Sequence, residues 1–121
     1  MGRERMDVGA RGEAVAAGYL IELGWNIVER NWRCPSGEID LVARDPAGVV
    51  VVCEVKTRSG TGYGAPLESI TYAKARRLRQ LAADWARAHP GLVRGLRVDA
   101  LGVLLRPGRT PVVEHVVGIE P

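Results

Sequence analysis

A carboxylate and an ammonium group lie two residues apart at the end of an apolar segment in the middle of the sequence. The segment "VVVVCEVKTR" runs from Val49 to Arg58, and its first five residues are apolar before Glu54 and Lys56 appear. Alternate residues of a strand share one face, so these two side chains stand side by side. With a second acid close to them, they could bind a hard cation such as Mg²⁺.

A second acid, Asp40, precedes this segment in "GEIDLVARD", where apolar and polar residues alternate with the period of a β-strand. The two predicted strands are joined by "DPAG", in which Asp, Pro and Gly occupy positions that a type I turn prefers. A three-residue loop with Pro46 first and a left-handed Gly48 last is a common hairpin connection. We therefore predict an antiparallel hairpin closed by the pair Asp45 and Val49.

This register brings the charged side chains onto one face of the hairpin. Asp40 lies opposite Glu54, with Cβ atoms ~5 Å apart. Ile39 and Leu41 lie together on the other face. Two ionised carboxylates so close raise each other's pKa, unless Lys56 or a divalent cation compensates their charge. A slip of one residue would move every side chain to the opposite face.

The first helix can bring another acid toward this hairpin. Residues 9–23, "GARGEAVAAGYLIEL", have small and apolar side chains at helical spacing, and Gly24 is a stop signal. The predicted buried stripe consists of Ala10, Ala14, Ala17 and Ile21. Glu13 borders the stripe, about 40° from Ala17 at ~100° per residue. The residues alone leave open whether it is an exposed acid favoured by the helix dipole or part of a site.

A second helix with a basic first half is predicted at residues 71–89, ending before Pro90 and Gly91. Its buried stripe is Leu78, Leu81, Ala82 and Trp85. The glycine-rich segment "TRSGTGYGAP" precedes it. Further strands are predicted in "WNIVERNWR", "LRVDALGVLL" and "VVEHVVGI". This order of elements predicts a mixed sheet with helices packed on it, of α/β or α+β class.

The composition is that of a globular protein expected to form one domain over residues 1–121. The N-terminus lacks the apolar stretch of a signal peptide, and no apolar run is long enough to span a membrane, so we expect a cytoplasmic protein. A net charge of +3 and a pI near 9.2 indicate a polyanionic partner only weakly. Cys53 is expected to be a small buried residue. His89 and His115 lack partners at helical or strand spacing and are expected to be incidental.

Spacing alone also allows a plain interpretation of the charged residues. Glu38, Asp40, Glu54 and Lys56 could be a surface patch of cross-strand charge pairs, because many strands contain a Glu-x-Lys pattern. The distribution of motifs along the chain separates the two interpretations better than the spacing does.

The strands "GEIDLVARD" and "VVVVCEVKTR" resemble the acidic-strand and ExK motifs of the PD-(D/E)XK nuclease superfamily. The chain as a whole resembles the YraN-type, endonuclease-like family of bacterial proteins. The segments that carry this resemblance are "GARGEAVAAGYLIELGW", "ERNWRCPSGEIDLVARD", "VCEVKTRSGTGYGAP", "KARRLRQLA" and "RVDALGV". The resemblance implies a restriction-endonuclease-like fold, a central mixed sheet flanked by helices. Ile39 precedes Asp40, so the Pro-Asp pair of the superfamily's name is absent.

The resemblance also implies roles for individual residues. Asp40 and Glu54 match the metal-binding acids, the backbone carbonyl of Val55 matches a further ligand, and Lys56 matches the catalytic lysine. Glu13 resembles the helix acid that Holliday-junction resolvases and related nucleases add to the catalytic metal site.

A basic surface is expected to hold the nucleic acid beside these residues. The expected contact residues are Arg58, Lys74, Arg76, Arg77 and Arg79. Lys74 also matches the place where related nucleases direct a polar helix residue toward the site.

The resemblance implies an endonuclease that depends on Mg²⁺ or Mn²⁺ and hydrolyses phosphodiester bonds of DNA, with branched, recombination or repair DNA as substrate. The alternative is a catalytically inactive nucleic-acid-binding or assembly protein that retains the fold. A third interpretation is a structural partner of a repair or uptake factor. Oligomeric state stays open, although junction-cutting relatives suggest a homodimer.

Overall fold

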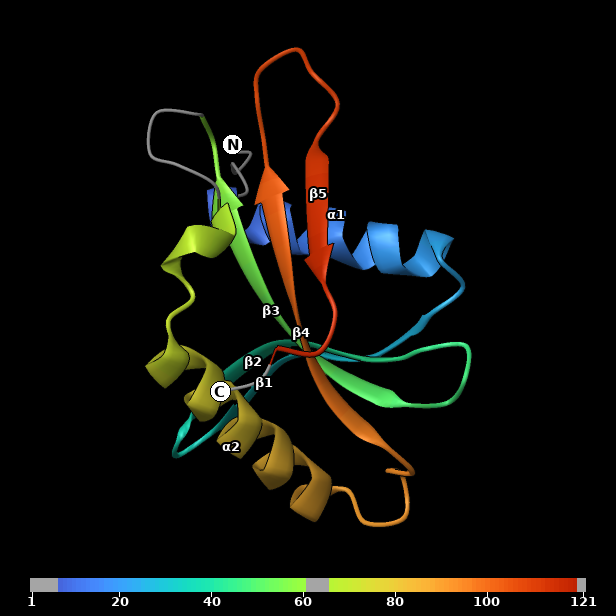
Figure 1. Ribbon diagram of the computed structural model, residues 1–121. Helices are drawn as coiled ribbons and strands as arrows, with labels where there is room; N and C mark the ends of the chain where they lie inside the picture. The colour runs from blue at the N-terminus through green and yellow to red at the C-terminus, as the bar shows by residue number, and fades with distance from the viewer. Residues whose placement is uncertain (1–6, 61–65, 120–121) are drawn as a thin grey trace, which may run out of the picture.

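Five strands form one sheet in which β3 and β4 run parallel and the other neighbours antiparallel, in the order β1-β2-β3-β4-β5 (Figure 1). The computed structural model describes residues 7–60 and 66–119. Its elements are α1 (Val8–Glu22), β1 (Asn26–Cys34), β2 (Gly37–Arg44), β3 (Val50–Arg58), the 3₁₀ turn η1 (Pro66–Ser69), α2 (Tyr72–Ala88), β4 (Leu96–Leu104) and β5 (Val112–Val116). Neither described helix is long and apolar enough to cross a membrane.

The two helices cover opposite faces of this sheet, because alternate residues of β3 contribute to different cores. Val51 and Cys53 pack on the side of α1, whereas Val50 and Val52 pack on the side of α2. The predicted α+β fold, a mixed sheet flanked by helices, is confirmed. Cys53 is fully buried, as predicted. The predicted glycine-rich segment lies partly outside the described residues.

The β2–β3 hairpin has the predicted register from the turn as far as Leu41. Leu41 pairs with Cys53, and the N–H of Asp45 donates to the carbonyl of Val49 at 3.0 Å. Gly48 has φ +90°, the left-handed conformation that the three-residue loop requires. The turn residues therefore determine which side chains of β2 and β3 lie at the same level.

The face assigned to Ile39 was wrong. Ile39 packs in the core beneath α2, whereas Leu41, two residues later, packs beneath α1. Regular pairing of β2 with β3 ends at Leu41, and the carboxylate of Asp40 accepts the N–H of Val55 at 2.8 Å. The side chain of Asp40 thus accepts the N–H of Val55, which a backbone carbonyl of β2 would accept if the regular pairing continued. Beyond this point the residues of β2 face the opposite side of the sheet.

Strand β1 is irregular at the same level. Arg30 pairs with Leu41 and Trp32 pairs with Ile39, so Asn31 lies level with Asp40. Asn31 has φ +53° and is the one described non-glycine residue with a positive φ. Asn adopts this left-handed conformation more readily than most residues. β1 and β2 therefore change direction together at Asn31 and Asp40.

The buried stripe predicted for α1 was wrong except at Ala17. The buried residues are Gly12, Ala16, Ala17 and Leu20, and Ala10, Ala14 and Ile21 are exposed. The close approach of Gly12 to β3 explains this rotation, because a Cβ atom at Gly12 would lie 1.8 Å from Thr57 Oγ1. Glu13 consequently lies within the arc of residues that faces the sheet.

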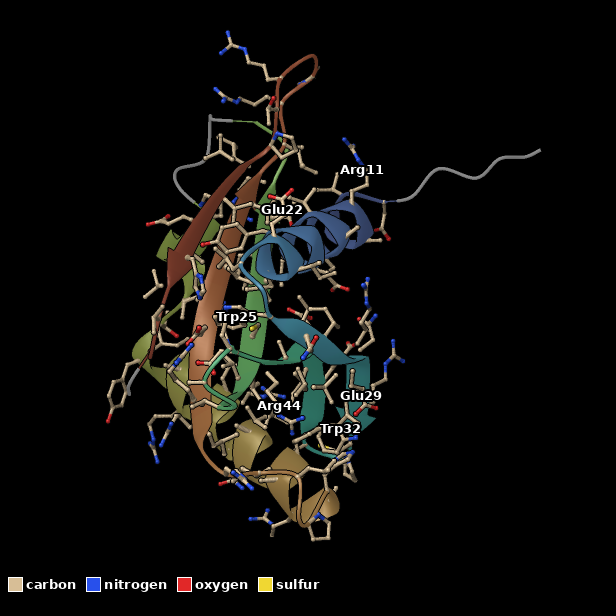
Figure 2. All side chains as sticks on the ribbon, turned by 90° about the vertical axis from the view of Figure 1, so that its right-hand side faces the viewer. Arg11, Glu22, Trp25, Glu29, Trp32 and Arg44 are labelled. Carbon is tan, nitrogen blue, oxygen red and sulfur yellow. The ribbon has the colours of Figure 1, made fainter. Side chains whose placement is uncertain are left out.

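Helix α2 buries the predicted stripe. Its first turn is capped by Thr71, whose hydroxyl accepts the N–H of Lys74 at 3.2 Å. Trp85 is fully buried, and its indole N–H donates to Glu29 at 3.0 Å. Figure 2 shows Glu29 beside Trp32 at the α2 end of the molecule. The bond to Glu29 ties α2 to β1, and the buried stripe packs on Val42 of β2 and Val52 of β3, the strands that carry Asp40 and Glu54.

The histidines are not incidental. Nε2 of His115 lies 2.8 Å from Oδ2 of the fully buried Asp99, and Nδ1 lies 3.1 Å from the hydroxyl of Tyr19. The ring of His89 stacks on Trp85 with centroids 4.0 Å apart. Asp99 and Tyr19 are 16 and 96 residues from His115, so no local spacing could indicate these partners.

Candidate active site

Asp40 lies where β2 departs from β3, and its carboxylate points into the resulting gap. Its Oδ2 atom accepts the N–H of Val55. The N–H and C=O of one strand residue point to the same side, so the carbonyl of Val55 is directed toward the same gap. The break in the hairpin thus gathers a carboxylate and a backbone carbonyl at one position.

Glu54 and Lys56 form a close ion pair on the α2 side of β3. Nζ of Lys56 lies 3.0 Å from Oε2 of Glu54, and the two side chains are 28% and 18% exposed. The pair is therefore partly shielded from water, which strengthens its electrostatic interaction relative to a fully exposed pair. Lys56 balances one carboxylate of the site.

The surroundings of Asp40 disfavour its ionised form. Burial, followed by the negative charge of Glu54, raises the pKa of Asp40 to about 7 from an ordinary 3.8. The hydrogen bond from Val55 opposes this shift but does not cancel it, and Glu13 and Glu38 add to it. The site consequently favours a bound proton or cation at Asp40.

Glu13 reaches the same acid from α1. Burial and the charge of Glu38 raise the pKa of Glu13, while hydrogen bonding with Asp40 and Asn31 acts in the opposite direction. Glu13 therefore approaches Asp40 from the α1 side, whereas Glu54 lies on the α2 side. The acids converge through the break in the sheet rather than on one face of a flat hairpin.

Two residues near these acids were not among the sequence candidates. Asn31 interacts with Glu13, and Glu38 interacts electrostatically with both Glu13 and Asp40. An Asn in the middle of a predicted strand was an available signal, because Asn disfavours strands and tolerates left-handed backbone. Glu38 was named from the sequence only as a member of the possible surface patch of charge pairs.

A pocket of about 230 Å³ opens beside Glu54 and Lys56, between β3 and α2. Its lining residues are Glu38, Glu54, Lys56, Ile70, Lys74, Arg77, Leu78 and Leu81. Lys74 and Arg77 therefore face the acids. Arg76 and Arg79 are exposed on α2 and do not line this pocket. The basic half of α2 thus presents cations on two sides, one of which adjoins the candidate site.

Backbone contacts help to fix the geometry around the pocket. Arg77 donates to the carbonyl of Ser36 at 3.1 Å, which ties α2 to the loop between β1 and β2. Arg58 ends β3 two residues after Lys56, on the same face by strand alternation. Each nucleic-acid-contacting residue predicted from the sequence now has a place relative to the acids.

The donors at the break suit a hard cation. Carboxylate and carbonyl oxygens are the ligands that Mg²⁺ takes, and Mg²⁺ commonly keeps several waters. The raised pKa of Asp40 indicates local negative charge that a cation would balance. Within residues 7–60 and 66–119, however, no three His, Cys, Asp or Glu side chains are grouped to hold a metal ion. A cation site would rest chiefly on Asp40 and Glu54.

Comparison with known proteins identifies the family. The model of a family described as "Uncharacterised protein family UPF0102" matches residues 12–103. The chain belongs to the UPF0102 family. A UPF0102 protein of Clavibacter michiganensis subsp. michiganensis is 55% identical over 116 residues, which cover 96% of this chain and 97% of the relative. The family indicated by the sequence motifs is confirmed.

Two solved structures show partial similarity to this UPF0102 chain. A repair endonuclease from Pyrococcus abyssi is 18% identical, with a TM-score of 0.47, and the match covers 80% of this chain and 40% of that chain. The structure of an EndoMS–dsDNA2 complex is 22% identical, with a TM-score of 0.44, and the match covers 78% and 37%. This chain spans less than half the length of either protein.

Proposed function

We propose that this UPF0102 protein is a DNA endonuclease that depends on Mg²⁺ or Mn²⁺ and acts on branched, recombination or repair DNA. The observation that carries the proposal is the convergence of Asp40 and Glu54 at a break in the sheet, beside Lys56 and a pocket with a basic wall. A set of surface charge pairs would leave each acid matched by a cation. Here the ion pairs of the described residues match Glu54 with Lys56 and Glu38 with Arg33, and none of them includes Asp40 or Glu13.

Phosphodiester hydrolysis requires an attacking water, charge neutralisation at the phosphate and stabilisation of the leaving oxygen. Asp40, Glu54 and the carbonyl of Val55 would hold the cation, with Glu13 approaching from α1. When bound, Mg²⁺ or Mn²⁺ supplies Lewis acidity and lowers the pKa of a coordinated water. The protein's own contribution is to keep these oxygens together despite their repulsion.

The role that we assign to Lys56 is to act on the reacting groups. Its ammonium lies against Glu54 at 3.0 Å, so the carboxylate fixes its position at the mouth of the pocket. From there it can orient the attacking water or stabilise negative charge that develops on the phosphate. Its positive charge makes it unsuitable as a cation ligand.

The pocket wall supplies groups for the flanking phosphates. Lys74 and Arg77 face the acids from α2, and Arg77 is held by its hydrogen bond to Ser36. Arg76 and Arg79 extend the positive surface along the helix. Contacts of this kind position a nucleic acid without reading its sequence.

A nucleic-acid-binding protein without catalysis is the second candidate. The observation that favours it is the lack, among the described residues, of three acids or other ligands grouped around one metal position. The basic pocket wall would serve either function. Divalent-cation binding and cleavage separate the two.

The decisive experiment compares Lys56→Ala with Glu54→Ala. Cleavage of single-stranded, duplex, flapped and four-way DNA is measured with and without Mg²⁺ or Mn²⁺, beside calorimetric Mn²⁺ titration. Lys56→Ala should lower the rate by ~10²–10³ and leave Mn²⁺ affinity unchanged or higher, because one preorganised donor and one opposing charge are lost. Glu54→Ala should lose both cation affinity and cleavage. Arg94→Ala, an exposed site on the α2–β4 connection, is the control.

Each outcome identifies a function. Wild-type protein that binds DNA but neither takes up Mn²⁺ nor cuts any substrate would support the binding protein and exclude the nuclease. Lys56→Ala that cuts like wild type would remove the lysine from the chemistry. Protein that neither binds nor cuts nucleic acid would leave the acids as a charged surface.

A further inference from the structure

A second group of cations lies beyond the pocket, at the carboxyl ends of β3 and β4. Arg58 follows Lys56 by two residues, ~7 Å further along the strand and on the same face. Helix α2 packs over the earlier half of β3, on Val50 and Val52. Arg58 therefore lies further along β3 from the part covered by α2 than Lys56 does. Figure 1 shows the carboxyl end of β3 directed away from α2.

Arg106 joins Arg58 from the neighbouring strand. The N–H of Leu105 donates to the carbonyl of Arg58 at 2.8 Å, which extends the β3–β4 pairing past the end of β4. Val103 and Leu105 pack in the core beneath α1. By alternation, Arg106 emerges on the other face, which is the face of Lys56 and Arg58.

Both arginines are half-buried and have no neutralising partner among the described residues. The Nε atoms of Arg58 and Arg106 are buried and have no hydrogen-bond partner, and neither side chain forms an ion pair with any described residue. Arg97, by contrast, pairs with Asp99 and Asp45. Within the described part of the chain, the one hydrogen bond of these two guanidinium groups is from Nη1 of Arg58 to the backbone carbonyl of Thr57, at 3.4 Å. A guanidinium that no carboxylate neutralises favours an external anion such as a phosphate.

We propose that Arg58 and Arg106 bind the phosphodiester backbone of a nucleic acid, on the far side of Lys56 from α2. The inference rests on the proposed function and adds the direction in which the strand leaves the site. Lys74 and Arg77 hold the backbone on one side of the acids, and the Arg58–Arg106 pair holds it on the other. A strand held on both sides has its scissile bond fixed over Glu54 and Lys56.

The test measures the salt dependence of DNA binding without cleavage. A short labelled duplex is titrated in buffer free of divalent cations, at several concentrations of monovalent salt, with wild type, Arg58→Gln, Arg106→Gln and the double variant. The plot of log affinity against log salt has a negative slope. Each single change should make this slope less steep by about 0.9, and the double change by about twice that. Arg106→Lys should keep the slope, because it keeps the charge.

The control is Arg94→Gln, which removes the same charge from the opposite end of β4. Its slope should equal that of wild type. Thermal melting checks that each variant is folded. If Arg58→Gln melts at a lower temperature than wild type, Arg58→Lys replaces it. Arg58→Lys keeps the charge and should show the same salt slope as wild type.

The outcomes separate this inference from the proposed function. If wild type binds DNA and the double variant keeps the full slope, the arginine pair is excluded while the nuclease proposal stands. If Arg94→Gln lowers the slope as much as Arg106→Gln, binding follows overall charge and the local site is excluded. Wild type that does not bind nucleic acid overturns both.

Discussion

The chain withdraws two aspartates from solvent and treats them in opposite ways. Asp99 is fully buried and accepts hydrogen bonds from Arg97, His115 and the N–H of Gly118. Asp40 is half-buried and accepts a backbone N–H, but its charged neighbours are acids.

The two environments shift the pKa in opposite directions. Burial alone would raise the pKa of Asp99, but the hydrogen bonds from Arg97, His115 and Gly118 hold it below its ordinary value. Burial and Glu54 raise the pKa of Asp40 to about 7. Asp99 is therefore ionised and neutralised by the protein itself, whereas the charge of Asp40 is left to a proton or a ligand.

The difference teaches how to tell a structural acid from a candidate catalytic acid in this fold. Around Asp99, the partners come from β4, β5 and the C-terminal segment, and Arg97 also lies over the ring of Trp25, which Figure 2 shows beneath α1. Around Asp40, the fold keeps like charges together, which destabilises the folded state when they are ionised. Such unfavourable arrangements concentrate at functional sites.

The largest effect on stability is expected at Asp99, whose charge is neutralised by Arg97 and His115. Asp99→Ala should lower the free energy of unfolding by about 3–5 kcal/mol, because Arg97 and His115 lose the carboxylate that pairs them. Urea denaturation at neutral pH measures the change. A loss below about 1 kcal/mol would contradict the structural role, since that is the size of an exposed ion pair.

Asp40→Asn, by contrast, should raise the free energy of unfolding. Above pH 7 the ionised Asp40 is destabilising, and a shift of about three pKa units corresponds to at most ~4 kcal/mol. We expect Asn to raise the free energy of unfolding by roughly half of that at about pH 8 and by little at about pH 4, while cleavage is lost. A destabilised Asp40→Asn at the higher pH would mean that the charge is already compensated.

The stability of the wild-type protein should fall as rising pH ionises Asp40. The folded pKa of Asp40 is raised, so the folded protein binds more protons than the unfolded chain between about pH 4 and 7, and stability falls as pH rises through that window. Mn²⁺ must displace the proton, so its affinity should rise with pH up to about 7 and then level off. Melting curves and calorimetry across this range test both trends, with Asp40→Asn as the control that should show neither.

The smallest effect is expected at Asn31, which positions Glu13. Asn31→Ala should cost about 1–2 kcal/mol because Ala disfavours the left-handed backbone, whereas Asn31→Gly should avoid that cost. Both variants should raise the pKa of Glu13 further, because they remove a hydrogen bond that lowers it. Carboxyl NMR titration provides the readout, and a pKa of Glu13 that matches wild type in Asn31→Gly would exclude the positioning role.

Local chemistry made much of the site predictable from the sequence. The residues between Asp45 and Val49 admit one favoured loop, and that loop pairs Leu41 with Cys53, so that Asp40 comes next to the part of β3 that carries Glu54 and Val55. The period of α2 likewise identifies its buried stripe, because the apolar residues repeat with the helical turn. The order of motifs along the chain was sufficient to indicate the family.

Long-range packing decided the remaining features. The rotation of α1 depends on the contact between Gly12 and Thr57, which are distant in the sequence, and this contact turns Glu13 toward the sheet. The break at Asn31 and Asp40 requires two strands to change direction together, so the period of either strand alone predicts the wrong face for Ile39.

Asp99 shows the same limit most clearly. Its sequence neighbours give no sign of His115, because only the pairing of β4 with β5 brings the imidazole to the carboxylate. The sequence by itself determined the local turns, helical periods and motif residues, since these depend on neighbours along the chain. Only the tertiary structure decided which acid is neutralised and which is left without a cation, because the electrostatic energy of a buried charge depends on groups brought together by folding.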